Sequence, residues 1–229
     1  GLGDVYKRQT LDDNYNQSLA QLGFVVINFA YRGSGPWRGR DFHTFGYGNL
    51  RDYALADDMA AIRQIAARYP CADIERVGIY GHSGGGFMTV AAMLNHPEFY
   101  KVGVAASGNH DNNIYSQWWG ETFHGVKQTW GKDGKPHFEC HIPTNIELAD
   151  RLAGRLLLIT GDMDNNVHPA STARLADALI RARKRFDMTV IPGADHGLGN
   201  SYYVNLIRYY FTEHLLGLPQ QEIDIVKHN

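Results

Sequence analysis

Short apolar runs recur along the chain and are separated by stretches with helical periodicity. Each run has few polar interruptions, which is typical of a strand buried on both faces of a parallel sheet. Strands are predicted on this basis at residues 24–30, 76–80, 102–106, 155–160 and 187–191. The sequence therefore predicts a sheet whose strands are mostly parallel.

Amphipathic segments occupy the intervals between these runs. The clearest covers residues 52–69, where apolar side chains recur every three or four positions and Pro70 ends the pattern. Further helices are predicted at residues 13–22, 87–94, 170–185 and 202–216. Because strands alternate with helices throughout, we expect an α/β fold with a doubly wound sheet.

The periodic pattern fades between residues 108 and 145, in a stretch rich in Trp, Tyr, His and Gly. A segment this long is unusual as a structureless loop in a compact domain. We interpret it as short helices and loops that form a cap or pocket wall. Residues 1–10 show no clear periodicity and are interpreted as a tail, so one folded domain is predicted over residues 11–229.

Composition and charge limit the classes of function. The chain has 229 residues, 44% of them hydrophobic, and a net charge of −2. This charge gives no electrostatic basis for binding nucleic acid or an anionic membrane. No apolar run has membrane-spanning length, and no secretory apolar segment opens the chain. Cys71 and Cys140 fit no metal or redox spacing and are expected to be free thiols, which leaves the compartment open.

A G-x-S-x-G motif, with Ser83 at its centre, lies between the strand at 76–80 and the helix at 87–94. In this context the sharp turn strains the serine backbone and lifts its hydroxyl above the sheet. We expect that a Cβ at Gly81 or Gly85 would crowd the crossing of strand and helix. The N–H of Gly84, at the start of the helix, could stabilise an oxyanion.

A serine hydroxyl needs a base to take its proton, and the base needs an orienting carboxylate. In α/β-hydrolase folds these groups follow in the order Ser, Asp or Glu, His, each after a strand. His196 follows the last predicted strand and is the expected base, while Asp164 follows the strand at 155–160. Asp162 lies too close to the strand end and is interpreted as a turn cap. Asp195 is next to His196 and is interpreted as a loop-stabilising carboxylate.

A metal site is the weaker interpretation of another cluster. His137, Glu139 and His141 would share one face of a strand, but no fourth ligand stands out. We interpret the segment as a solvated loop and expect neither metal nor cofactor. The basic residues near 181–185 complement a helix dipole and do not indicate nucleic-acid binding.

Four motifs together resemble one known family. They are Gly-His-Ser-Gly-Gly-Gly at 81–86, Gly-x-x-Asp-x-Asn-Val at 161–167, Asp-His-Gly at 195–197 and Arg-Gly-Ser-Gly at 32–35. In this order they resemble the catalytic α/β-hydrolase domain of the prolyl oligopeptidase family, above all its dipeptidyl-peptidase IV-like branch. The resemblance runs from about residue 24 to residue 216.

The resemblance implies a role for each matching residue. Ser83 corresponds to the nucleophile, Asp164 to the orienting acid and His196 to the base. The N–H of Gly84 corresponds to one donor of the oxyanion hole.

The resemblance also implies a substrate site. Asn166 is similar to the asparagine of this branch that touches the substrate near its carbonyl. Tyr115, Trp118 and Trp119 fall where the family places aromatic side chains around a proline-sized specificity pocket.

The chain departs from the family pattern in several ways. Family members carry a β-propeller before the hydrolase domain, and its acidic residues hold the substrate N-terminus in the dipeptidyl branch; these 229 residues contain no such region. The Tyr-x-Gly-Pro-like segment, which supplies the second oxyanion donor, and the first strands of the sheet are also missing. We therefore expect a fragment with an incomplete sheet on its N-terminal side, whose open edge favours aggregation. Loss of one oxyanion donor typically costs about 10²–10³ in turnover.

Three functions follow as hypotheses. The first is a serine peptidase that cleaves short peptides after Pro or a small residue through an acyl-enzyme on Ser83. The second is a carboxylesterase with the same triad, since triad geometry does not separate esters from amides. The third is an inactive fragment that only folds or binds partners. The expected partner is a peptide substrate, with no nucleic acid and no membrane segment, and the family resemblance also allows a homodimer.

Overall fold

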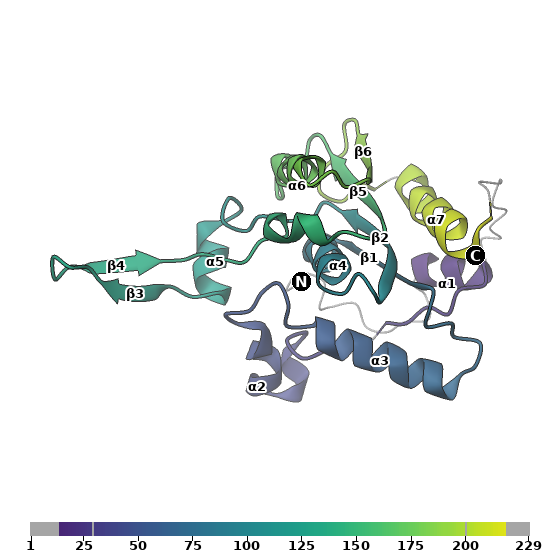
Figure 1. The fold of residues 1–229 in the computed structure, drawn as a ribbon, viewed down its shortest axis with the longest axis horizontal. Helices are drawn as coiled ribbons and strands as arrows, with labels where there is room; N and C mark the ends of the chain where they lie inside the picture. Colours follow the sequence, from purple (N-terminus) through teal and green to yellow (C-terminus); the bar gives the residue numbers. More distant parts are fainter. Residues whose placement is uncertain (1–13, 29, 200, 219–229) are drawn as a thin grey trace.

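The chain folds around a four-stranded parallel sheet, as Figure 1 shows for a computed structural model that describes residues 14–28, 30–199 and 201–218. The strands are β1 (Val77–His82), β2 (Tyr100–Ala106), β5 (Arg155–Gly161) and β6 (Asp187–Ile191). They lie in the order β1-β2-β5-β6, and each pair is parallel. Four of the predicted strands are thus confirmed, as is the parallel sheet.

Helices cover both faces of this sheet (Figure 1). One face packs against α3 (Leu55–Arg68), α4 (Gly84–Asn95) and α6 (Ala170–Arg181). The other face packs against α1 (Asn14–Gln21) and α7 (Ser201–Leu216). The predicted doubly wound arrangement is therefore confirmed.

The inner strand β5 shows why the run from Leu156 to Ile159 is apolar without interruption. Leu156 and Leu158 pack with the helices of the first face, whereas Leu157 and Ile159 pack with those of the second. Successive side chains of a strand point to opposite faces, so a strand between two helix layers must be apolar throughout.

The predicted strand at residues 24–30 is wrong for its described part. Residues 24–28 and 30 belong to no strand. They line a cavity of about 1470 Å³ whose lining also includes the β1 edge, from Val77 to His82. Without a neighbouring strand within hydrogen-bonding distance, an apolar run cannot form a ladder.

Helix ends also differ from the prediction. The helix predicted over 170–185 ends at Arg181, because Arg183 adopts a φ of 56° and the N–H of Lys184 bonds back to the carbonyl of Leu179 at 2.9 Å. This reversal closes the last turn in the manner of a Schellman motif. α3 ends at Arg68, before the predicted Tyr69, since a residue that precedes proline is disfavoured in helical conformation.

The region after β2 contains a long projection in addition to the expected short helix. α5 (Gln117–Phe123) is followed by an antiparallel hairpin of β3 (Lys127–Trp130) and β4 (Pro136–Glu139), which extends away from the body and is called the arm below (Figure 1). The sequence prediction of helices and loops missed this hairpin. Its side chains are nearly all exposed, so no alternation of buried and polar residues marked the strands.

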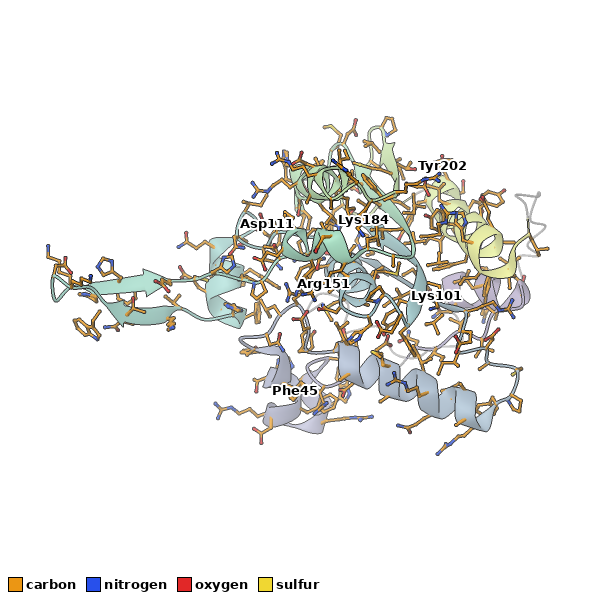
Figure 2. The ribbon with its side chains drawn as sticks, in the orientation of Figure 1. Phe45, Lys101, Asp111, Arg151, Lys184 and Tyr202 are labelled. Atoms are coloured by element: carbon orange, nitrogen blue, oxygen red, sulfur yellow. The ribbon has the colours of Figure 1, made fainter. Side chains whose placement is uncertain are left out.

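Short helical turns complete the loops. They are α2 (Arg40–His43) and the 3-10 turns η1 (Pro36–Arg38), η2 (Thr44–Gly46) and η3 (Ile146–Arg151). Phe45, labelled near α2 in Figure 2, lies under the guanidinium of Arg32 at 4.1 Å. Arg32 also pairs with Asp57 on α3, and this hydrogen-bonded pair lowers the pKa of the Asp57 carboxyl. The pair anchors the predicted Arg-Gly-Ser-Gly loop to the body.

Candidate active site

Ser83 occupies the turn between β1 and α4, at the carboxyl end of the sheet. Its backbone has φ 59° and ψ −123°, a conformation that non-glycine residues rarely adopt. The turn is held by the Ser83 N–H, which donates to the carbonyl of Ala106 at 2.8 Å, and by the Phe87 N–H, which donates to the carbonyl of Ser83 at 3.0 Å. These bonds keep the serine in the strained position that the motif predicts.

The glycines of the motif serve different purposes. A Cβ on Gly81 would lie 2.4 Å from the backbone carbonyl of Gly85, so the expected crowding is confirmed there. A Cβ on Gly85 would meet nothing within 4 Å, so the same expectation is wrong at Gly85. The second crowded position is Gly86, where a Cβ would lie 2.5 Å from the carbonyl oxygen of Ala106, because α4 crosses β2 at this point.

His196 lies between Ser83 and Asp164. Its Nε2 is 2.9 Å from Ser83 Oγ, and its Nδ1 is 2.8 Å from Asp164 Oδ2. Because a carboxylate only accepts hydrogen bonds, Nδ1 carries the proton, and Nε2 of the neutral ring is free to accept from the serine hydroxyl. This arrangement can take the hydroxyl proton as the serine attacks an acyl carbon.

Asp164 is held in place by backbone donors. Its side chain is buried, and Oδ1 accepts the N–H groups of Asn166 at 3.0 Å and Val167 at 2.9 Å. Oδ2 then remains directed at His196. Both oxygens of this buried carboxylate are thus hydrogen-bonded, as burial requires.

The two other carboxylates considered from the sequence hold the loops. Asp162 Oδ1 accepts the N–H of Gly193 at 2.6 Å, which joins the loop after β5 to the loop after β6. Asp195 Oδ1 accepts the N–H of Gly197 at 2.9 Å. The loop-stabilising role predicted for Asp195 is therefore confirmed. The bond of Asp162 goes to a different loop from the turn that this residue was expected to cap.

Gly84 is the first residue of α4. The N–H groups of a first helical turn lack acceptors within the helix, and the helix dipole favours negative charge at this end. The Gly84 N–H is therefore available beside Ser83 for an oxyanion. Its assignment as an oxyanion donor stays a prediction.

Comparison with known proteins places the chain in a family. A model of the prolyl oligopeptidase family matches residues 10–218. The chain belongs to the prolyl oligopeptidase family. Dipeptidyl peptidase 8 of Homo sapiens is 29% identical over 198 residues, which cover 84% of this chain and 22% of that protein.

Two solved structures of bacterial proteins have a similar fold. Dipeptidyl peptidase 4 of Porphyromonas gingivalis superposes with a TM-score of 0.69 at 25% identity, over 80% of this chain and 26% of that one. A protein of Bacteroides ovatus superposes with the same TM-score of 0.69 at 31% identity, over 80% of this chain and 25% of that one. The fold is therefore the α/β-hydrolase fold. The chain spans about a quarter or less of the length of these relatives.

The structure brings part of the predicted prolyl oligopeptidase-type pocket to the triad. The Tyr115 hydroxyl donates to Asn166 Oδ1 at 2.8 Å, and its ring contacts Trp119 with centroids 5.8 Å apart. Burial, and then the nearby Asp164 charge, raises the pKa of Tyr115, so this phenol stays protonated and able to donate. Trp118 is 71% exposed, because adjacent helical residues project in different directions. Tyr115, Trp119 and Asn166 thus form one group, and Trp118 lies outside it.

His82 is a residue of the site that the sequence analysis passed over. Its Nε2 lies 2.5 Å from the carbonyl oxygen of His196, and the two imidazole rings have centroids 4.7 Å apart. Its position directly before Ser83 indicated only that it lies near the site. His82 is the first variable residue of the G-x-S-x-G motif, and the motif does not say what such a residue contacts.

The candidate metal cluster does not assemble. His137 is exposed on the arm, and His141 Nε2 lies 3.1 Å from Glu147 Oε1. Among the described residues, no three His, Cys, Asp or Glu side chains are grouped to hold a metal ion. Cys71 and Cys140 are free and exposed, as predicted. Within the same part of the chain, no helix combines the length and apolar character needed to cross a bilayer.

Proposed function

We propose that this chain is the catalytic part of a serine peptidase that hydrolyses short peptides, in the manner of a dipeptidyl peptidase acting after Pro or a small residue. The observation that carries the proposal is the hydrogen-bonded series from Ser83 through His196 to the buried Asp164. Membership of the prolyl oligopeptidase family and the likeness to dipeptidyl peptidases support the same reaction.

In the proposed first step, Ser83 Oγ attacks the scissile carbonyl carbon while its proton passes to His196 Nε2. The carbonyl oxygen becomes an oxyanion, and the N–H of Gly84 stabilises it. Collapse of this intermediate breaks the C–N bond, and His196 gives its proton to the departing amine. The product of this step is an acyl-enzyme ester on Ser83.

In the second step, water attacks the ester carbon, and His196 accepts one of its protons. Collapse of the second intermediate returns that proton to Ser83 Oγ and releases the carboxylic acid product. Asp164 stays ionised throughout and stabilises the imidazolium form of His196 in each step. The enzyme ends in its starting protonation state.

The substrate-binding part of the proposal rests on Asn166 and Tyr115. Their hydrogen bond places an amide and a phenol next to the loop that carries Asp164. The Asn166 side-chain N–H₂ is a donor suited to a peptide carbonyl, and the rings of Tyr115 and Trp119 supply an apolar wall for a proline-sized side chain. Trp118 is not needed for this pocket.

The test compares two substrates with the whole chain and its Ser83→Ala variant. We expect cleavage of Gly-Pro-p-nitroanilide by the parent chain and only background cleavage by the variant, together with Ser83-dependent labelling by a fluorophosphonate. Ser83-dependent cleavage of p-nitrophenyl butyrate alone would replace the peptidase with an esterase. A folded sample without labelling or turnover would refute the proposal and leave an inactive fragment.

A further inference from the structure

His82 contacts the backbone of the residue proposed as the base. It is the last residue of β1 and directly precedes Ser83. Its Nε2 lies 2.5 Å from the His196 carbonyl oxygen, and its ring packs at 53° to the His196 ring with centroids 4.7 Å apart. Because a carbonyl oxygen only accepts, Nε2 of His82 is the donor. The tautomer of His82 that carries its proton on Nε2 is therefore the one that fits this contact.

We propose that His82 is a positioning residue that fixes the backbone of His196 relative to Ser83, an inference that rests on the proposed peptidase function. Ser83 and His196 are 113 positions apart in the chain, so their alignment depends on tertiary contacts. The bond between Ser83 and His196 changes when its proton moves during attack. The bond from His82 goes to a carbonyl and is unaffected by that transfer.

The loop that carries His196 is held from two sides. On the β5 side, the Met163 N–H donates to the carbonyl of Ala194 at 3.0 Å, and Asp162 accepts from Gly193. On the β1 side, His82 reaches the carbonyl of His196. Removal of the second contact leaves the base aligned with Asp164 and loosens it relative to Ser83.

This difference predicts which kinetic constant changes. The contact does not touch the proposed substrate pocket of Tyr115 and Asn166, so substrate binding and KM are expected to stay the same. The alignment of nucleophile and base governs the chemical step, and small misplacements of reacting groups reduce its rate strongly. The effect should therefore appear in kcat and in the rate of fluorophosphonate labelling.

Two substitutions separate the donor from the ring. His82→Phe keeps an aromatic ring but removes the N–H, whereas His82→Gln loses the ring but keeps an N–H at a similar reach. The side chain borders the cavity of about 1470 Å³, which leaves room for either replacement. For Gly-Pro-p-nitroanilide we expect His82→Phe to lower kcat about tenfold with KM unchanged. We expect His82→Gln to keep kcat within about threefold of the parent value.

A second measurement does not depend on turnover. Amide hydrogen exchange across residues 194–199 should be faster in His82→Phe than in the parent, and close to the parent in His82→Gln. Equal exchange and equal kcat in the parent and His82→Phe would overturn the positioning role while leaving the peptidase proposal intact. A kcat of His82→Gln as low as that of His82→Phe, with a melting temperature like that of the parent, would also overturn it.

The two proposals fail in different ways. If the parent chain shows no Ser83-dependent turnover, the peptidase proposal fails. The exchange comparison then still reports whether His82 holds the loop of His196.

Discussion

The surroundings of β1 differ sharply between its carboxyl end and its open edge. At its carboxyl end, the polar groups of Ser83, His196 and Asp164 are joined by hydrogen bonds of 2.8–2.9 Å. Along its open edge, β1 faces a cavity of about 1470 Å³ that also borders the apolar residues 24–28. The first region is held by hydrogen bonds. The second is only partly packed, since Phe24 and Val26 contact the core around α7 while the cavity lies beside them.

This contrast shows that the site and the sheet edge depend on different parts of the chain. The site is built from the ends of β1, β5 and β6 and the first turn of α4, and none of these elements includes residues 24–28. At the open edge, residues 24–28 and most of β1 line the cavity and are left only partly buried or exposed. The hydrogen-bonded geometry can therefore persist where packing is incomplete.

The largest expected effect tests the site through its two neighbouring carboxylates. Asp164→Asn should lower kcat for Gly-Pro-p-nitroanilide roughly 10⁴-fold, because the amide cannot stabilise the imidazolium and favours the wrong tautomer of His196. Asp162→Asn is the matched control, since its side-chain oxygen can still accept from Gly193. We expect a change of less than about threefold in this control.

Steady-state kinetics of both variants decide the assignment of the acid. A large loss in Asp162→Asn together with a small loss in Asp164→Asn would exchange their roles. Circular dichroism of each variant checks that the fold is retained.

The next effect tests packing with an isoleucine-to-alanine substitution at two places, one in the interior of the sheet and one beside the cavity. Ile159→Ala removes methyl groups from a fully buried position in β5 and should lower the free energy of unfolding by about 2–5 kcal/mol. Ile27→Ala removes the same groups beside the cavity and should cost about 1 kcal/mol or less, because that side chain is only partly buried and lines the cavity. Urea denaturation measures both.

An equal loss in the two isoleucine variants would show that residues 24–28 pack as firmly in solution as the interior of β5. The contrast between the two regions would then not hold for stability.

The smallest effect concerns the buried polar residues that follow β2. His110 is fully buried, its Nδ1 lies 3.2 Å from the amide nitrogen of Asn145, and burial lowers its pKa to about 3. The pKa of a histidine in the unfolded chain is about 6.5, so between pH 3 and 6.5 the unfolded chain binds more protons. His110 should therefore make stability fall as the pH falls below about 6.5, by up to about 1.4 kcal/mol per pH unit.

The control for this pH dependence is His110→Asn, which keeps a polar group without a titrating imidazole. The difference between the parent and the variant in free energy of unfolding should shrink as the pH falls from 7 to 5. A difference that is constant over this range would mean that His110 has an ordinary pKa in the folded protein.

Asp111, labelled between α5 and α6 in Figure 2, shows how this polar segment is tied to the body. It is buried and pairs with Arg174 of α6 at 3.0 Å. Asn113 in turn donates to the carbonyl of Ile142 at 2.9 Å and to Asp111. These bonds hold the start of the segment that carries Tyr115.

Much of the sheet could be predicted, because a strand between two helix layers carries apolar side chains on both faces, as Leu156–Ile159 of β5 do. The same rule failed at residues 24–28 and 30, since an apolar run becomes a strand only beside a partner. The arm was missed because its side chains face solvent, although Asp133-Gly134 in its turn is a typical hairpin pair.

The positions of Ser83, Asp164 and His196 could be predicted, since each follows a strand and parallel strands end at one edge of the sheet. The open space beside Gly85 and the contact of His82 with the His196 backbone could not. Both depend on the distance between segments far apart in sequence, and that distance has no local pattern.

The arm also divides the polypeptide in a way that separates the reacting groups. Ser83, with β1 and β2, precedes the arm, and Asp164 and His196, with β5 and β6, follow it. A break in the exposed turn of the arm would therefore leave the nucleophile on one fragment and its acid–base pair on the other. The parallel pairing of β2 with β5 lies across that boundary, so backbone hydrogen bonds, rather than chain connectivity, would keep the two fragments in register.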